Sequence, residues 1–426
     1  MSQTIINGDS LEELKLIKDD TIDAVITDPP YGIAFLGKDW DSFRGTKVAK
    51  SQVVKNLGTG MRMTTHRENL NYQEWCEQWA RECLRVLKPG GWLLAFSAAR
   101  LYHRIAAGIE DAGFEVRDQI MWIYASGFPK AQDIGKAIQR RQGVEEYEGF
   151  VDTTKNAGFG QTDHARVRAG VEWSTRETQV GKAKCTSPEA KQWSGWKTAL
   201  KPAHEPIVMA RKPMKGSTID NVLKHGVGAL NIDATRIASN DKPQANSKGT
   251  TKGFRKFMDK HQKGEAQDNS NDQGYIPNTE GRFPSNVVGE IADYQKYFYC
   301  PKVSRRERHR GFEQEHIPAP FGDVKGAYVD GERMAKVADD TQYANAGNNH
   351  PTVKPVELMK YLVKLVTAQG SHIVDPFSGS GSTGMACKEL ARTFTGIDLD
   401  PHYCEIARRR IAATKEDLSE TLFDQD

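Results

Sequence analysis

The chain has 426 residues, of which 38% are hydrophobic and 27% charged, and its net formal charge is only +3. This composition provides for a buried core and excludes a wholly disordered chain, a collagen-like repeat and a membrane protein. No apolar run approaches the roughly 18 residues that span a bilayer, and the N-terminus does not resemble a signal peptide. The six cysteines are scattered without a CxxC pair, which argues against a disulfide framework or a zinc site. We therefore expect a reduced, cytoplasmic protein.

In chain order, apolar runs and helical periodicities predict a strand at 4–6, a helix with Ser10 as its N-cap, a strand at 22–27, a helix at 72–87 stopped by Pro89-Gly90-Gly91, a strand at 92–96, a helix at 101–112 and a strand at 115–124. The C-terminal part predicts a helix at 355–367, a strand at 371–374, a helix at 383–391, a strand at 393–397 and a helix at 401–411. Strands that alternate with helices predict an α/β fold with a doubly wound, mostly parallel sheet. Residues 130–350 lack clear periodicity and are interpreted as a large irregular insertion.

The small net charge hides an uneven distribution. Residues 1–40 sum to −5 and residues 389–426 to −4, whereas residues 164–215 sum to +7 and residues 301–310 to +4. Residues 40–67 are also basic. Basic stretches suit a phosphate backbone, whose neutralisation releases counterions, although any single stretch is equally compatible with a solvated surface. Three such stretches between acidic ends favour a nucleic-acid partner.

The first motif, Asp28-Pro29-Pro30-Tyr31, follows the strand expected at 22–27. Ligands of open α/β sheets bind beyond the carboxyl ends of strands, and consecutive prolines stiffen a turn and leave carbonyls without neighbouring N–H donors. This arrangement suits a planar base that carries an amino group, because Asp28 can accept from the amino group while Tyr31 stacks on the ring. An ordinary strand-ending turn with a packed Tyr31 is the alternative.

The second motif, residues 375–384, follows the strand expected at 371–374 and opens a helix. Its glycines, Gly379, Gly381 and Gly384, fit G-x-G-x-x-G, which alone is weak support for a dinucleotide site. Asp398 ends the next predicted strand, where its carboxylate could hold ribose hydroxyls. Together these features predict an adenosine-type cofactor without saying which one. Glycines that serve only a tight turn are the alternative.

Asp28-Pro29-Pro30-Tyr31 near the N-terminus and the Phe377-x-Gly379-x-Gly381 loop near the C-terminus resemble the motifs of β-class, phage-type DNA amino-methyltransferases. The resemblance implies a circularly permuted class I methyltransferase fold, S-adenosylmethionine as cofactor, double-stranded DNA as partner and a bacterial or phage-encoded enzyme. It covers roughly residues 1–125, 198–213 and 350–411. The implied cofactor-binding residues are Asp9, Lys354, Asp375, Phe377, Gly379, Gly381, Thr383 and Asp398, and the implied catalytic residues are Asp28, Pro29, Pro30 and Tyr31.

The implied mechanism is direct methyl transfer to an exocyclic amine of a base flipped out of the helix. Asp28 and the Pro29 carbonyl would stabilise the charge that develops on nitrogen. No cysteine nucleophile is needed, and the reversed pair Cys300-Pro301 is discarded as one. His204 and Glu205, in a segment that resembles the last-strand hairpin, are interpreted as structural rather than as a catalytic pair.

DNA contacts are expected from the basic stretches, with Arg44, Lys47, Arg305, Arg306 and Arg308 as candidates. Gly37 and Gly45 would act as hinges of a loop that closes over the flipped base. Trp193 and Trp196 could stack on DNA, but packing in a small satellite core is preferred. The expected regions are a catalytic half (1–130), a basic insertion (131–200), a last-strand hairpin (201–213), a target-recognition region (214–349), a cofactor-binding half (350–412) and an acidic tail (413–426).

The form Asp-Pro-Pro-Tyr favours N6-adenine as the methylated position, and N4-cytosine remains open because the same motif layout supports it. Two further alternatives are a nicotinamide-dependent oxidoreductase that uses the glycine loop and a DNA-binding protein on a decayed methyltransferase scaffold. The oxidoreductase leaves Asp28 to Tyr31 unexplained, and the intact motifs argue against decay. A homodimer and a restriction endonuclease partner are left open, and no membrane partner is expected.

Overall fold

A computed structural model describes residues 1–33, 41, 43, 65–124, 131–143, 147–148, 182–183, 185–200, 202–237, 281–289, 303–312, 328–329, 332–333, 347–350 and 352–416. Its elements in chain order are β1 (Gln3–Asn7), α1 (Ser10–Lys15), β2 (Ile22–Thr27), α3 (His66–Val86), β3 (Leu87–Phe96), α4 (Tyr102–Asp111), β4 (Glu115–Ile123), α5 (Ile134–Arg141), β5 (Tyr147–Glu148), β6 (Lys182–Ala183), α7 (Pro188–Gln192), β7 (His204–Arg211), α8 (Thr218–His225), the 3₁₀ turn η3 (Asp233–Thr235), β8 (Val287–Gly289), α10 (Arg305–Arg308), β9 (Tyr328–Val329), β10 (Glu332–Arg333), α12 (Val356–Val366), β11 (His372–Asp375), α13 (Ser382–Glu389), β12 (Thr393–Asp398) and α14 (Pro401–Ala412).

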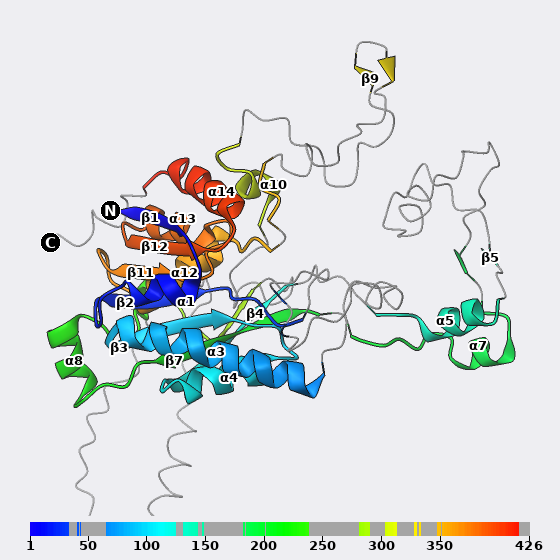
Figure 1. Ribbon diagram of the computed structural model, residues 1–426, viewed down its shortest axis with the longest axis horizontal. Helices are drawn as coiled ribbons and strands as arrows, with labels where there is room; N and C mark the ends of the chain where they lie inside the picture. Colours follow the sequence, from blue (N-terminus) through cyan, green and yellow to red (C-terminus); the bar gives the residue numbers. More distant parts are fainter. Residues whose placement is uncertain are drawn as a thin grey trace, which may run out of the picture.

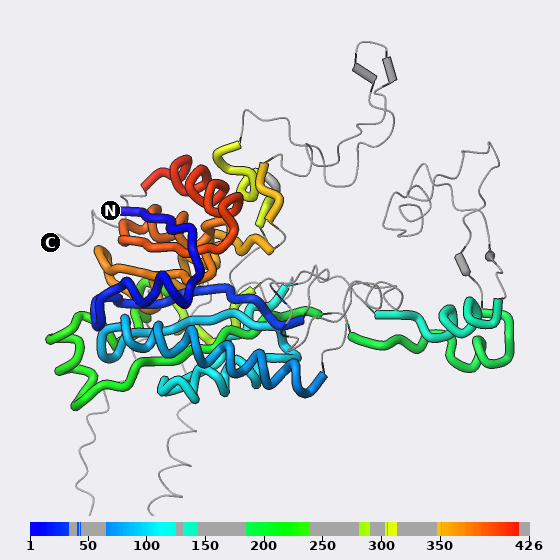
Figure 2. The backbone as a smooth tube through the Cα atoms, viewed as in Figure 1, coloured from blue at the N-terminus to red at the C-terminus, as the bar shows by residue number. Residues whose placement is uncertain are grey.

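Within the described residues, an eight-stranded sheet forms the centre of the protein, in the order β1-β12-β11-β2-β3-β7-β4-β8 (Figure 1). Its neighbours pair in parallel, except that β7 runs antiparallel to both β3 and β4. The two ends of the chain build it together, since β11 and β12 lie between β1 and β2. Figure 2 shows this as blue and orange segments side by side. The predicted α/β fold with a mostly parallel, doubly wound sheet is confirmed.

Hydrophobic cores cover both faces of the sheet. All of β2 is buried, as expected for a strand of a parallel sheet that has helices on both sides. Ala24 and Ile26 belong to a core with residues of α12 and α13, whereas Val25 between them belongs to a core with residues of α3 and α4. This alternation places β2 between the two helical layers, and the motif that begins at Asp28 follows its carboxyl end.

The predicted start of the first helix was wrong by one residue. Asp9, not Ser10, is the N-cap of α1, because the Asp9 carboxylate accepts a hydrogen bond from the Leu11 N–H at 2.8 Å. The Ser10 hydroxyl instead donates to the Pro376 carbonyl and so joins α1 to the loop after β11.

Two boundaries around α3 also differ from the prediction. The helix begins at His66, earlier than expected, because Thr65 and Glu68 form a capping box. Pro89-Gly90-Gly91 do not follow the helix as a loop but lie inside β3. Gly90 takes a φ of +80° there, and its N–H donates to the Lys212 carbonyl just beyond β7.

In the part of the chain that the structure describes, no helix is long and apolar enough to cross a membrane. The same residues contain no cluster of three or more His, Cys, Asp or Glu that could hold a metal ion. Cys76, Cys83, Cys185, Cys387 and Cys404 are free thiols, and Cys300 lies outside the described residues.

Candidate active site

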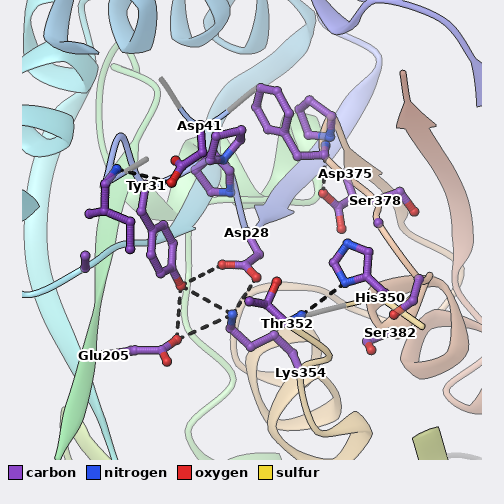
Figure 3. A pocket seen from close by; sticks show the side chains of 18 of the residues that line it. Asp28, Tyr31, Asp41, Glu205, His350, Thr352, Lys354, Asp375, Ser378 and Ser382 are labelled. Carbon is purple, nitrogen blue, oxygen red and sulfur yellow. Dashed lines mark hydrogen bonds and ion pairs between the residues drawn. The ribbon is translucent and has the colours of Figure 1, made fainter. Parts of the chain in front are cut away.

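A cavity of about 1730 Å³ opens at the carboxyl ends of the parallel strands. Residues that follow β1, β2, β11 and β12 line it, as expected for an open α/β sheet. Because β7 runs antiparallel, its first residues, His204 and Glu205, reach the same edge. Both motifs identified in the sequence therefore line one cavity, and Figure 3 shows Asp28 and Asp375 in that single view.

Asp28 lies within a network of four polar side chains (Figure 3). The Tyr31 hydroxyl is 2.7 Å from Asp28 Oδ1 and 3.0 Å from Glu205 Oε2. The Lys354 ammonium forms an ion pair with Asp28 Oδ2 and lies 3.4 Å from Glu205 Oε2. Because the charged side chains are only 7% to 22% exposed, water screens these interactions weakly.

The protonation states in this network follow from burial and mutual charge. Burial raises the pKa of Asp28, despite the opposing effect of Lys354, and the charge of Glu205 adds to the rise. Burial alone would lower the pKa of Lys354, but the attraction of Asp28 and Glu205 outweighs it and raises that pKa. Burial and the two carboxylates also raise the pKa of Tyr31 well above its usual value. Near neutral pH, Lys354 is therefore charged and Tyr31 remains a hydrogen-bond donor.

The turn after Tyr31 is anchored by Asp41, a residue that the sequence did not single out. Its carboxylate, 1% exposed, accepts from the backbone N–H groups of Gly32 at 2.6 Å and Ile33 at 3.2 Å. Gly32 adopts a φ of +68°, and a Cβ there would lie 2.8 Å from the Tyr72 ring. These contacts hold the backbone that carries Tyr31 in one conformation.

Asp375, the last residue of β11, anchors the loop that follows this strand. This carboxylate, 2% exposed, accepts from the hydroxyls of Thr27 at 2.7 Å and Thr383 at 2.6 Å, and from the Phe377 N–H at 3.1 Å. Burial raises the pKa of Asp375 to about 6. Asp375 and Thr383 thus bind each other and fix the loop relative to β2.

The glycine loop needs two residues in the left-handed region. Gly379 has a φ of +49° and Gly381 a φ of +76°, conformations that strain any other residue. A Cβ on Gly379 would lie 2.8 Å from His350 Nε2, and one on Gly381 would lie 2.9 Å from the Cβ of Ala407. The loop is therefore packed closely on both sides.

Phe377, the aromatic residue of this loop, lines the cavity and joins an aromatic cluster on α3. Its ring centroid lies 5.3 Å from that of Trp75 and 5.7 Å from that of Trp79. These distances are typical of favourable aromatic pairs. Helix α3 therefore supports the loop that the sequence identified as a cofactor site.

Asp398 is the last residue of β12, and Asp9 follows the neighbouring strand β1. Both residues line the cavity. Asp398 Oδ2 accepts from the Gly379 N–H at 2.8 Å and Oδ1 from the Asp400 N–H at 2.9 Å. A carboxylate has about four acceptor sites, so Asp398 retains capacity for further donors. Asp9, by contrast, uses Oδ1 to cap α1.

His350 lies between the glycine loop and α14. Its ring centroid is 4.6 Å from that of Tyr403, in a T-shaped arrangement. Burial, with the nearby charge of Lys354, lowers the pKa of His350 to about 3. The His350 imidazole, which lines the cavity, is therefore uncharged at physiological pH.

The predicted DNA contacts are only partly described. Arg44 and Lys47 lie outside the described residues, and so does the Arg305 side chain. Arg306 is exposed. The Arg308 guanidinium does not project from the surface, because it donates to the His350 carbonyl at 2.7 Å and is half-buried. Its placement makes it a support of the cavity wall.

The expectation for the tryptophans of the middle region was wrong. Trp193 and Trp196 contact each other with ring centroids 5.1 Å apart, but they remain 39% and 60% exposed. They follow α7, which packs against α5, and the buried residue of α7 is Ala190. They are therefore not the buried centre of a satellite core.

Glu205 belongs to the network around Asp28, although the sequence favours a structural role for it over a catalytic pair with His204. The signal that could have located it is the antiparallel direction of β7, which brings the amino end of that strand to the carboxyl ends of its parallel neighbours. Lys354 was expected at the cofactor, and its ammonium lies between Asp28 and Glu205.

Comparison with known proteins places this cavity in context. The sequence matches the family described as DNA methylase (N6_N4_Mtase) over residues 22–409. It is 25% identical over 431 residues to the type II methyltransferase M.HindIII of Haemophilus influenzae, covering 97% of each chain. It is 22% identical to the type II methyltransferase M.HpaI of Haemophilus parainfluenzae, covering 96% of this chain and 74% of the other. Among solved structures, the cytosine-N4-specific PvuII DNA methyltransferase matches with a TM-score of 0.45 and 13% identity, covering 96% of this chain and 86% of that one.

Proposed function

Because the chain belongs to the DNA methylase family, whose methyl donor is S-adenosylmethionine, we propose that it methylates the N6 amino group of adenine in double-stranded DNA. The observation that carries this proposal is the position of Asp28, at the carboxyl end of β2, in the cavity that the glycine loop also lines. A carboxylate on the turn that follows the strand can accept a hydrogen bond from an exocyclic amino group. The form of the motif at residues 28–31, Asp-Pro-Pro-Tyr, favours adenine over cytosine.

The residues present fit S-adenosylmethionine. Asp398 retains acceptor sites at the end of β12, where ribose hydroxyls can donate to it. The loop at Gly379 presents backbone without a side chain. Ser378, which lines the cavity, has a buried hydroxyl with no hydrogen-bond partner among the residues that the structure describes. Asp9, two residues after the Asn7 that pairs with Asp398, also lines the cavity.

When bound, the cofactor supplies an electrophilic methyl group on a sulfonium. The chain's own residues then have two tasks, to align the amino nitrogen with that methyl and to stabilise the positive charge that develops on the nitrogen. Asp28 can do both by accepting from the amino group, and its raised pKa makes it a better acceptor for the proton that leaves. Tyr31, from the same turn, supplies the ring on which the base stacks.

The base must leave the duplex to reach this cavity, which implies flipping. The region from 214 to 349, with the basic insertion at 131–200, is proposed to hold and read the duplex. Arg306 is the described candidate for contact with the DNA backbone. The homodimer and the restriction endonuclease partner rest on the family resemblance alone. The oxidoreductase alternative loses its support, since the glycine loop belongs to a DNA methylase.

The test is incubation of double-stranded DNA of varied sequence with S-adenosylmethionine labelled in its methyl group, followed by digestion to nucleosides. Label in N6-methyladenine supports the proposal, whereas label in N4-methylcytosine replaces adenine by the alternative base. The Asp28→Ala variant, purified in the same way, tests the role of Asp28. Label that persists undiminished with Asp28→Ala contradicts the role assigned to Asp28.

A further inference from the structure

Glu205 shares both of the donors that bind Asp28. The Tyr31 hydroxyl lies within hydrogen-bond distance of Asp28 Oδ1 and of Glu205 Oε2, at 2.7 and 3.0 Å. The Lys354 ammonium pairs with Asp28 Oδ2 and lies 3.4 Å from the same Glu205 oxygen. Glu205 therefore faces Asp28 across its two donors (Figure 3).

This geometry creates a competition for the charge of Asp28. Each oxygen of Asp28 already accepts from one protein donor, and although a carboxylate keeps further acceptor sites, these donors weaken its interaction with the amino group of the base. A tyrosine hydroxyl has one proton, so it can donate fully to only one carboxylate at a time. Glu205 is the alternative acceptor for that proton, and a small shift of the two donors toward it frees Asp28.

Net charge leads to the same residue. Asp28 and Lys354 alone are a neutral ion pair, and a neutral pair stabilises a developing cation weakly. With Glu205 the cluster carries one net negative charge, since Tyr31 stays protonated. Glu205 thus offsets Lys354 and leaves the charge of Asp28 available to the substrate nitrogen.

We propose that Glu205 is a positioning residue for methyl transfer, which accepts the Tyr31 hydroxyl and the Lys354 ammonium when the target base enters and so releases Asp28 to bind the amino group. The inference rests on the proposed function of the cavity. It assigns Glu205 no contact with the base and no bond that forms or breaks.

The test compares wild type, Glu205→Gln and Glu205→Asp in single-turnover methylation at saturating DNA and S-adenosylmethionine. Glutamine keeps the shape and removes the charge, whereas aspartate keeps the charge and withdraws it by about 1.5 Å. We expect the glutamine variant to lose on the order of a hundredfold in the rate of transfer, because the acceptor of the base is misaligned. The aspartate variant should recover part of that loss, and cofactor affinity measured by calorimetry should stay within about twofold of wild type.

A second readout separates this role from a purely structural one. The charge of Glu205 contributes to the raised pKa of Asp28. Its removal should therefore move the acid limb of the rate profile to lower pH. Glu115→Gln is the matched control, because Glu115 also binds a cation across neighbouring strands, Arg211 at 2.8 Å, away from the cavity. That variant should leave the rate and the acid limb unchanged.

The inference is overturned by a glutamine variant with the wild-type rate. It is also overturned by a slow variant whose acid limb does not move, or by a rate loss that only parallels a loss of cofactor affinity and thermal stability. These outcomes differ from failure of the proposed function, which shows in the wild-type enzyme as an absence of N6-methyladenine. If the wild type labels N4 of cytosine instead, the same comparison on that base decides the role of Glu205.

Discussion

Substitution of Gly379 by alanine tests the close approach between the glycine loop and His350. Gly379 has a φ of +49°, and a left-handed conformation costs an L-residue about 1–2 kcal/mol. The new Cβ would also lie 2.8 Å from His350 Nε2. His350 has little room to yield, because its ring packs on Tyr403 and its carbonyl accepts from Arg308. The loop itself must therefore move.

Gly370→Ala separates these two costs. Gly370 has a φ of +79°, but the nearest atom to its Cβ would be the Met1 Cε at 3.8 Å, an ordinary contact. Both variants should lose about 1–2 kcal/mol of unfolding free energy in urea from backbone strain, and Gly379→Ala should lose more. Only Gly379→Ala should weaken S-adenosylmethionine binding, by about tenfold for each 1.4 kcal/mol that the displaced loop costs.

The measurements are urea unfolding monitored by tryptophan fluorescence and calorimetric titration of the cofactor. The reasoning is refuted if Gly379→Ala binds S-adenosylmethionine as tightly as Gly370→Ala does. Restoration of affinity by a second change, His350→Ala, would identify the imidazole as the obstacle. Affinity that stays low in the double variant would assign the loss to backbone strain alone.

Further predictions concern the catalytic carboxylate, the support of the loop and a helix cap. Asp28→Ala should keep cofactor affinity and lose turnover; a collapse of affinity in calorimetry would contradict its role. The wild-type rate should fall as pH drops through the Asp28 pKa, because a protonated carboxyl has lost the negative charge that stabilises the developing cation, and this limb should lie above pH 3.8, the pKa of an unburied aspartate. Arg410→Met should cost about 1–3 kcal/mol in urea unfolding, because the buried guanidinium donates to the Ser380 carbonyl at 2.6 Å; a gain in stability would show that burying the charge costs more. Thr65→Ala should cost about 1 kcal/mol by loss of the capping box, and an unchanged midpoint would mean that this cap is frayed in solution.

Much of the fold was predictable because its strands are short, apolar and bounded by recognisable turns. β2 illustrates this. Its apolar run ends at Thr27, and the motif that begins at Asp28 lies at the carboxyl end of the strand, where open α/β sheets bind their ligands. Boundaries were harder to predict where two signals compete. Pro89-Gly90-Gly91 normally ends a helix, yet here pairing with the residues after β7 draws the glycines into β3.

The site was predictable only as far as its residues form local motifs. Asp28 and the glycine loop are contiguous segments whose chemistry can be read from neighbours in the sequence. Glu205 and Asp41 act through tertiary position, since each acquires its partners from a turn that it does not belong to. Arg308 shows the opposite case. Its place in a basic run predicts contact with DNA, whereas in the structure its guanidinium donates to the backbone carbonyl of His350.

The interleaving of the two chain ends has a consequence for synthesis of the protein. On one side, β2 pairs with β11, which lies far along the chain. Ala24 pairs with Ile373, and the Thr27 hydroxyl donates to Asp375, 348 residues later. Contacts so distant along the chain close late and fold slowly. Asp28 therefore leaves the ribosome long before Lys354, its ion-pair partner, and the cavity cannot exist on a nascent chain. An interrupted translation product carries the first motif but lacks a cofactor site, and so cannot methylate DNA.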